Sequence, residues 1–249
     1  MSTDLSEFAI GYEGDAQREQ AYELAERLQL PVDNQAARQL LVTEERLVLK
    51  VPPFLPMYAD FSVKTWQKRR DAGKQQGLIR ACKPVPGLKI VDATSGWGRD
   101  AAILASYGAE LVMLERDPIM ATLLMDALQH RDERSRHVMK LMVRQSDALD
   151  YLNRLSDKDY PDVIYMDPMH PVRQKSALVK KDLQILQQFI GCDEDALDLL
   201  KLAQKKALKK VVVKWPQQSP PLLPPASSIT GKTVRFDIYQ RVTDSDQKA

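Results

Sequence analysis

The sequence predicts an α/β fold in which a mainly parallel sheet is covered by helices on both faces. From residue 88 onward, short apolar runs alternate with segments of helical periodicity, which is typical of such sheets. A glycine-containing loop joins the first of these runs to a helical segment, as in nucleotide-binding α/β units. Two extended runs near the end of the chain can add an antiparallel hairpin to the sheet.

The composition excludes several classes of protein. With 249 residues, 44% hydrophobic and 28% charged, the chain can bury one large core, or one large and one small core. The two cysteines, Cys82 and Cys192, are isolated, which gives no metal-binding spacing and favours a reducing compartment. The polar N-terminus does not resemble a signal peptide, and no apolar run reaches the roughly 18 residues of a membrane span. We expect a cytoplasmic protein with no metal and no membrane contact.

Residues 1–61 predict a small N-terminal α/β subdomain. Residues 8–10 are expected to form a short strand, and residues 15–28 have the apolar spacing of a helix. Residues 40–49 are typical of a hairpin whose turn lies at 43–45. No catalytic pattern occurs here, so the expected roles are packing or positioning of a substrate.

Residues 62–87 form a basic connecting segment. Between Ser62 and Lys89 there are eight Lys or Arg and one Asp, whereas residues 1–61 carry eleven acidic and five basic residues. Such asymmetry suggests an anionic partner, and cations around an aromatic residue such as Trp66 suit a phosphate backbone. The alternative is a solvated basic face. The cations expected to bind RNA here are Lys64, Lys68, Arg69, Arg70 and Lys74.

The third predicted segment, residues 88–249, contains the main sheet. The expected strands are 88–91, 110–115, 141–143, 163–166 and 211–214. The expected helices are 99–107, 118–128, 149–155, 176–190 and 194–208. A proline-rich connection, 216–225, precedes the final two extended runs, which flank Gly231.

The loop after the first of these strands has the chemistry of a cofactor site. Gly96 and Gly98 allow a sharp turn and close approach of a ligand, and Glu115, seventeen residues past Gly98, is placed to bind a ribose diol. Asp92 would repel a pyrophosphate but suits the amino group of S-adenosylmethionine. The pattern resembles motif I of class I methyltransferases. An NAD-linked oxidoreductase, which Asp92 disfavours, and a plain strand-to-helix turn are the alternatives.

A second motif, Asp167-Pro168-Met169-His170-Pro171, follows the fourth strand, where open α/β sheets bind ligands. It resembles the (Asn/Asp)-Pro-Pro-(Tyr/Phe) loop of methyltransferases that act on exocyclic amines of bases. Asp167 and the Pro168 carbonyl can accept the amine hydrogens, and His170 can stack on the base. A plain strand-to-turn signal is the alternative. The location 75 residues after Asp92, at the matching strand, favours the catalytic interpretation.

Several segments together resemble the bacterial 16S ribosomal RNA (guanine-N2)-methyltransferases of the RsmJ type. They are VDATSGWGRDA, MLERDP, YMDPMHP with QKSALVKK, KKVVVKWP and TVRFDIY, within residues 60–239. The resemblance implies a class I fold, S-adenosylmethionine as methyl donor and a guanosine of 16S rRNA as substrate. It also implies the cofactor-site residues Arg99, Asp100, Glu115, Arg116, Ser146, Asp147 and Asp167. The family usually has Phe or Tyr at the position of His170, and more glycines in the segment matching 69–76.

Two functions from different classes follow. The first is a monomeric methyltransferase acting on 16S rRNA or the small ribosomal subunit; the second is a non-catalytic RNA- or ribosome-binding protein on the same fold. Asp167-Pro168 favours the first, because a binding protein needs no amine acceptor beside a cofactor. Further cations follow the catalytic loop and are expected to bind RNA: Arg173, Lys175, Lys180 and Lys181.

Overall fold

The computed structural model describes residues 5–73, 75–169 and 195–243. These residues divide into two compact units. The smaller contains residues 5–60, 117–130 and 169, and the larger contains residues 61–116, 131–168 and 195–243. Among the described residues, no helix has the length and apolar character needed to cross a membrane.

The smaller unit holds a three-stranded sheet and two helices. Its elements are β1 (Phe8–Tyr12), α1 (Arg18–Leu28), β2 (Arg38–Val42), β3 (Leu47–Lys50) and α5 (Pro118–Gln129), with short 3-10 turns at Leu5–Glu7 and Asp15–Gln17. The strand order is β1-β2-β3, with β1 parallel to β2 and β2 antiparallel to β3. The predicted strand, helix and hairpin are therefore confirmed.

Helix α5 begins as its sequence predicts. Pro118 occupies its first turn, where a missing backbone N–H costs nothing. The Asp117 side chain accepts a hydrogen bond of 2.9 Å from the backbone N–H of Met120 and so caps the helix.

The larger unit is built on one seven-stranded sheet. Its strands are β4 (Lys89–Asp92), β5 (Glu110–Glu115), β6 (Lys140–Gln145), β7 (Val163–Met166), β8 (Lys210–Pro216), β9 (Ser227–Thr230) and β10 (Val234–Gln240). The strand order is β6-β5-β4-β7-β8-β10-β9, and all neighbours are parallel except β10, which is antiparallel to both β8 and β9. This confirms the predicted parallel sheet with an antiparallel hairpin.

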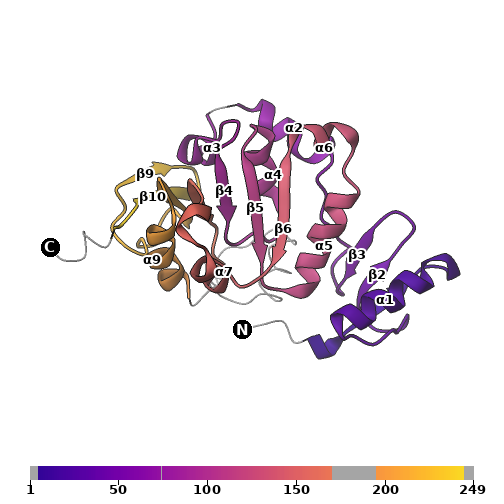
Figure 1. Cartoon of the computed structure of the whole chain (residues 1–249). Coiled ribbons are helices and arrows are strands. Elements are labelled where there is room, and N and C mark those ends of the chain that lie inside the picture. The colour runs from indigo at the N-terminus through magenta and orange to yellow at the C-terminus, as the bar shows by residue number, and fades with distance from the viewer. Residues whose placement is uncertain (1–4, 74, 170–194, 244–249) are drawn as a thin grey trace. The chain divides into compact units, whose positions relative to one another are not determined.

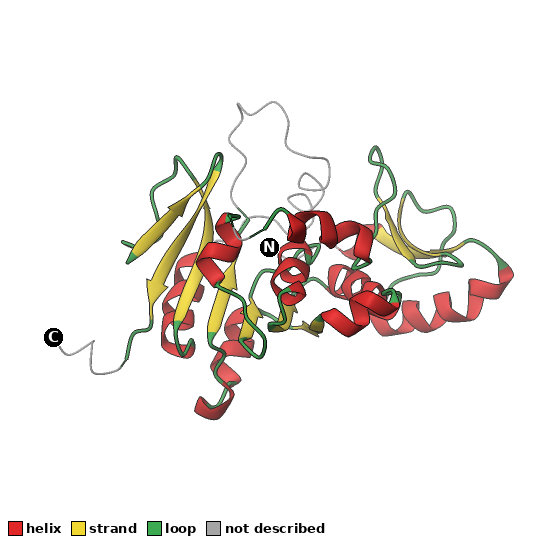
Figure 2. Cartoon of the chain, turned by 90° about the horizontal axis from the view of Figure 1, so that it is seen from above, coloured by secondary structure: helices red, strands yellow, loops and turns green. Residues whose placement is uncertain are grey.

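Helices line this sheet (Figure 2). They are α2 (Val63–Asp71), α3 (Gly77–Cys82), α4 (Arg99–Ser106), α6 (Glu133–Val138), α7 (Ala148–Arg154) and α9 (Ala196–Lys206), with a 3-10 turn at Asp157–Asp159. Helices α4, α7 and α9 were predicted, whereas α2, α3 and α6 are findings of the structure. The helix expected at 176–190 lies outside the described residues.

The alternation of side chains along β8 separates the two faces of the sheet. Val211 and Val213 are buried in a cluster with residues of α7 and α9, such as Leu152 and Leu200. Lys210 and Lys214 point to the other face, where Lys210 contacts α3 and Lys214 contacts α4. Side chains of β7 and β8 therefore meet α4 on this face, where Tyr165 and Lys214 both contact Asp100.

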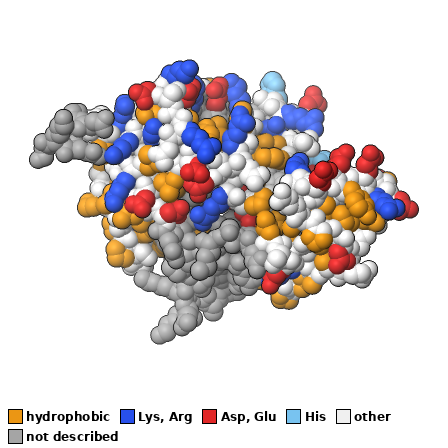
Figure 3. Space-filling model, turned by 60° about the horizontal axis from the view of Figure 1, so that its bottom comes forward, with side chains coloured by type: hydrophobic (Ala, Val, Ile, Leu, Met, Phe, Trp, Pro, Cys, Tyr) orange, Lys and Arg blue, Asp and Glu red, His pale blue; other side chains and the backbone are white. Residues whose placement is uncertain are grey.

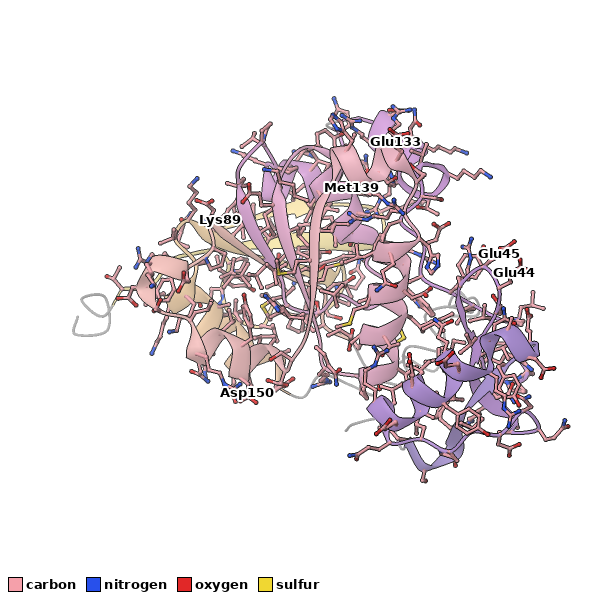
Figure 4. All side chains as sticks on the ribbon, turned by 45° about the vertical axis from the view of Figure 1, so that its right-hand side comes forward. Glu44, Glu45, Lys89, Glu133, Met139 and Asp150 are labelled. Carbon is pink, nitrogen blue, oxygen red and sulfur yellow. The ribbon has the colours of Figure 1, made fainter. Side chains whose placement is uncertain are left out.

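The carboxyl ends of the parallel strands share one edge of the sheet. The arrows of β4, β5 and β6 point the same way in Figure 1. In Figure 4, Met139, which precedes β6, and Asp150, which follows it, mark the opposite ends of that strand. The loops beyond the carboxyl ends form the candidate site.

Candidate active site

The loop between β4 and α4 needs its two glycines. Gly96 has φ 52° and Gly98 has φ 68°, a left-handed conformation that side chains with a Cβ disfavour. Gly98 lies directly before α4, and its carbonyl accepts a hydrogen bond of 2.9 Å from the N–H of Ala102. The loop thus turns sharply into a helix N-terminus, as expected for a site that a ligand approaches closely.

Two predicted acidic residues end the strands beside this loop. Glu115, at the end of β5, accepts a 3.2 Å hydrogen bond from the Gly96 N–H through Oε2. Asp92, at the end of β4, is only 2% exposed, and its Oδ1 accepts a 3.2 Å bond from the Thr94 N–H. Burial raises the pKa of Asp92 to about 8, with smaller contributions from Asp100, Asp167 and Glu115.

A network of charges connects α4 to the loop after β7. The Lys214 ammonium donates to Asp167 Oδ2 at 2.6 Å and to Asp100 Oδ2 at 3.1 Å. Asp100 Oδ2 also accepts a 2.6 Å bond from the hydroxyl of Tyr165, and Asp100 Oδ1 pairs with the guanidinium of Arg69 at 2.6 Å. Asp100 is therefore held from α2, β7 and β8 at once.

The pKa values in this network follow from its charges. Burial alone would raise the pKa of Asp100, but Lys214 and Arg69 outweigh it and bring that pKa to about 2. Burial alone would lower the pKa of Lys214, but Asp100 and Asp167 raise it above its usual value. Both groups are thus charged at neutral pH.

Asp167 is fixed by its backbone as well as its side chain. Its N–H donates a 2.6 Å hydrogen bond to the hydroxyl of Thr94, which belongs to the glycine loop. The two predicted motifs therefore contact each other directly. Pro168 follows Asp167 in the described part of the chain, whereas His170 lies outside it.

Four further predicted cofactor residues lie around the same edge. The Ser146 N–H donates a 3.0 Å bond to the Glu115 carbonyl, so the end of β6 stays beside the end of β5. Asp147 caps α7 through Oδ1, which accepts from the N–H groups of Leu149 and Asp150. Arg99 is an exposed first residue of α4, and Arg116 pairs with Asp195 at 3.6 Å.

The predicted RNA-binding cations of α2 fall into two groups. Lys64 and Lys68 are exposed. Arg69 enters the charge network through Asp100, and the Arg70 guanidinium lies over the ring of Trp66, 5.9 Å from its centroid. The remaining predicted RNA-binding residues lie outside the described residues: Lys74, Arg173, Lys175, Lys180 and Lys181.

Three residues of the site were not predicted: Thr94, Tyr165 and Lys214. Tyr165 and Lys214 are separated in sequence, but they lie on the neighbouring strands β7 and β8, near the end of the region where these strands pair. A lysine directly after Val211–Val213 was the available signal, since the same argument was applied to Asp167 after its strand. Thr94 carries no signal beyond its place in the glycine loop.

The chemistry of the site suits a cationic cofactor. Three carboxylates, of Asp100, Asp167 and Glu115, are close enough to Asp92 to raise its pKa, and the cations Lys214 and Arg69 pair with Asp100 and Asp167. Burial and these neighbouring carboxylates raise the pKa of Asp92, and a ligand ammonium beside it would favour the ionised form. Within the described ranges, no group of three or more His, Cys, Asp or Glu could hold a metal ion.

Comparisons with known proteins agree with this chemistry. Residues 23–241 match the family model described as "Putative SAM-dependent methyltransferase". The chain is similar to Ribosomal RNA small subunit methyltransferase J of Legionella pneumophila (strain Philadelphia 1), with 58% identity over 93% of this chain and 95% of the relative. The protein of that name from Coxiella burnetii (strain Dugway 5J108-111) is 41% identical over 93% of this chain and 96% of its own length.

A solved structure is similar over nearly the whole chain. It is a SAM-dependent methyltransferase from Neisseria gonorrhoeae, with a TM-score of 0.71 and 26% identity. The match covers 94% of this chain and 96% of that one.

Proposed function

The chain belongs to the family of ribosomal RNA small subunit methyltransferase J, and from this premise we propose that it methylates the exocyclic N2 amine of a guanosine in 16S rRNA. S-adenosylmethionine is the methyl donor of the family. The observation that carries the proposal is the place of Asp167, which is hydrogen-bonded to the glycine loop at the carboxyl edge of the sheet. A carboxylate there can hold an amine beside a cofactor that lies on the loop.

The residues proposed to hold the cofactor surround that loop. The backbone of Gly96 and Gly98 permits close approach, Glu115 binds the ribose diol, and Asp92 faces the amino group. The bound cofactor supplies a methyl group activated by a sulfonium. Arg99, Asp100, Arg116, Ser146 and Asp147 complete the proposed set.

Asp167 is proposed to orient the amine rather than to act as a strong base. The lone pair of an exocyclic amine is delocalised into the ring, which makes the nitrogen a weak nucleophile. Asp167 and the Pro168 carbonyl would accept its two hydrogens and favour a pyramidal nitrogen. So held, the nitrogen would direct its lone pair at the methyl group of the cofactor, which would leave its sulfur as the bond to nitrogen forms, and the nitrogen would then release one proton to solvent.

The target guanine must leave any RNA duplex to reach the candidate active site. An amine inside a duplex cannot approach Asp167, so the base is unpaired or flipped, at a cost of a few kcal/mol. His170 is proposed to stack on the base, in the place where relatives usually have Phe or Tyr. Positioning of two bound reactants can lower the activation free energy by roughly 7–11 kcal/mol.

RNA binding is proposed for α2 and for the cations around the catalytic loop. Lys64 and Lys68 are exposed on α2, and Arg69 of the same helix contacts Asp100 in the candidate active site. An RNA strand bound along α2 would therefore lead toward that site. Figure 3 shows Lys and Arg side chains spread widely over one face among acidic ones, so a test needs a control cation elsewhere.

The proposal is tested by mass spectrometry of 16S rRNA from a strain that lacks the gene. One N2-methylguanosine should be missing. The wild-type gene should restore it, and a gene carrying Asp167→Ala should not. An unchanged pattern of methylation in the deletion strain would contradict the proposed reaction. It would favour the alternative, a non-catalytic RNA- or ribosome-binding protein.

The remaining proposals concern the state of the protein. We propose that it acts in the cytoplasm as a monomer, on 16S rRNA or the small ribosomal subunit, without a metal. Light scattering after size exclusion should give the mass of one chain, 28.3 kDa. Methylation in vitro should continue in EDTA. Residues 1–61 are proposed as a subdomain that positions substrate, with residues 62–87 connecting it to a methyltransferase domain at 88–249.

A further inference from the structure

We propose that Lys214 is a positioning residue for methyl transfer, whose ammonium joins the carboxylates of Asp100 and Asp167 and thereby fixes the orientation of Asp167. The inference rests on the proposed function, in which Asp167 holds the target amine. Lys214 lies on β8 and is not among the residues proposed to hold the cofactor or the target amine.

The sheet register places Lys214 where it can do this. Met166, the last residue of β7, pairs with Val213 of β8, so the residues that follow, Asp167 and Lys214, are neighbours just beyond the paired region. Lys214 shares a face of β8 with Val212, which pairs with Tyr165, and the hydroxyl of Tyr165 also contacts Asp100. The contact is therefore a consequence of strand pairing rather than of a long side chain reaching across the surface.

The burial of Lys214 indicates that its charge is held there by its partners. Its side chain is 26% exposed, and a lysine so placed is costly unless it is paired. Its Nζ lies 2.6 Å from Asp167 and 3.1 Å from Asp100. Without the ammonium, these two carboxylates would repel each other across the space that it fills.

The bond from Lys214 leaves Asp167 able to receive an amine. A carboxylate has about four lone-pair positions, and an ionised one accepts hydrogen bonds without donating any. An ammonium 2.6 Å from the carboxylate favours this ionised form, because opposite charges at that distance attract. Among the described residues, Tyr165 from β7 and Arg69 from α2 also face the pair, both through Asp100.

The test compares Lys214→Met, Lys214→Gln and Lys214→Arg with wild type in single-turnover methylation of small subunits, at saturating S-adenosylmethionine and across pH. The control is Lys209→Met. Lys209 precedes the same strand and pairs with Asp162 at 3.0 Å, at the end away from the site. Thermal unfolding identifies a variant that does not fold, and Lys214→Gln, which keeps a donor without the charge, then replaces Lys214→Met.

The expected result has two parts. The rate at neutral pH falls on the order of 10- to 100-fold in Lys214→Met or Lys214→Gln, because Asp167 loses its fixed orientation. The acidic limb of the rate profile moves up by about one to two pH units, because a carboxylate without its cation ionises less readily. Lys214→Arg should restore much of both, and Lys209→Met should resemble wild type.

A merely structural ion pair would behave differently. Loss of such a pair could lower the stability of Lys214→Met. The methylation rate of the folded variant, however, would depend on pH as it does in wild type. Rates and acidic limbs equal to those of wild type in folded Lys214→Met or Lys214→Gln would overturn the inference. If wild type itself methylates neither small subunits nor free 16S rRNA, the proposed function is wrong instead, so the two failures are distinguishable.

Discussion

Asp92 is buried near other carboxylates, and its raised pKa should be visible in the pH dependence of stability. Its pKa is raised to about 8 in the folded protein, chiefly by burial, whereas an unfolded aspartate titrates near 4. The folded state therefore binds one more proton than the unfolded state between these values. By linkage, the free energy of unfolding decreases as pH rises from about 4 to about 8 and is lowest above that.

Asp92→Asn should remove this loss of stability. The variant has no proton to release, so its stability relative to wild type should grow with pH, reaching the order of a few kcal/mol above pH 8. Denaturant unfolding at pH 5, 7 and 9 measures the difference, with Asp150→Asn on the exposed start of α7 as the control. Parallel pH profiles for Asp92→Asn and wild type would contradict the assignment. Cofactor affinity should fall in the same variant, because the neutral amide cannot pair with an ammonium.

Glu115 gives a second test at the scale of one residue. Its carboxylate accepts the N–H of Gly96 and is proposed to bind the ribose, so Glu115→Ala should weaken S-adenosylmethionine binding by about 1–3 kcal/mol. Glu110→Ala, at the opposite end of β5, removes only a surface pair with Lys140 and should bind normally. Calorimetry with S-adenosylmethionine and with NAD makes the comparison. Tight NAD binding without S-adenosylmethionine binding would reject the cofactor assignment.

At the scale of elements, helix α2 is anchored firmly enough for its charges to be tested. Asp132 of α6 accepts a 2.6 Å hydrogen bond from the Val63 N–H at the start of α2. The buried indole of Trp66 donates a 2.9 Å bond to the Ser135 hydroxyl. Substitutions on the exposed side of α2 should therefore leave the helix in place.

Lys64→Glu with Lys68→Glu is the resulting test of RNA binding. Both side chains are exposed, whereas reversing Arg69 would also disturb Asp100 and the site. RNA affinity should fall, and the dependence of affinity on salt should become shallower by about 0.7–0.9 for each phosphate that the helix no longer neutralises. Lys201→Glu on α9 is the matched control. Unchanged affinity and salt slope would show that α2 does not contact the RNA.

How far the sequence predicts an element depends on how that element is stabilised. The strands β4, β5, β7 and β8 were predicted because they are apolar runs buried on both faces, and α4 because its residues are buried almost throughout. Helix α2 was missed because only Trp66 of its nine residues is buried, so no apolar periodicity exists. Helix α6 is held by the cap of Asp132 and buries only Ser135, which patterns of hydrophobicity cannot reveal.

The site was predictable to the extent that each residue stands next to a strand end. Asp92, Glu115 and Asp167 each end a predicted strand or follow it directly, and the parallel sheet brings those ends together. The pairing of Arg69 with Asp100 could not be predicted, because it depends on how α2 packs against α4. The contact of Lys214 with Asp167 depends on β7 and β8 being neighbours in the sheet, which the sequence implies only once the fold is assumed.

At the scale of the whole molecule, the strand order brings the residues proposed for catalysis and cofactor binding to one edge of the sheet. In this order, β5 and β6 lie on one side of β4, and β7 and β8 lie on the other. Open α/β sheets bind ligands outside the carboxyl ends of the strands, at the switch point where the strand order reverses. The glycine loop after β4 and Asp167 after β7 flank it, joined by the bond from the Asp167 N–H to Thr94.

The central claim is that Asp167 holds the target amine at this switch point, and single-turnover methylation of small ribosomal subunits tests it most directly. Asp167→Ala should be slower by on the order of 100-fold or more, with little change in RNA affinity, because it loses the acceptor and the partner of Lys214. Asp167→Asn, which keeps an acceptor oxygen without the charge, should retain part of the activity. An Asp167→Ala variant that methylates at the wild-type rate would show that the active site lies elsewhere.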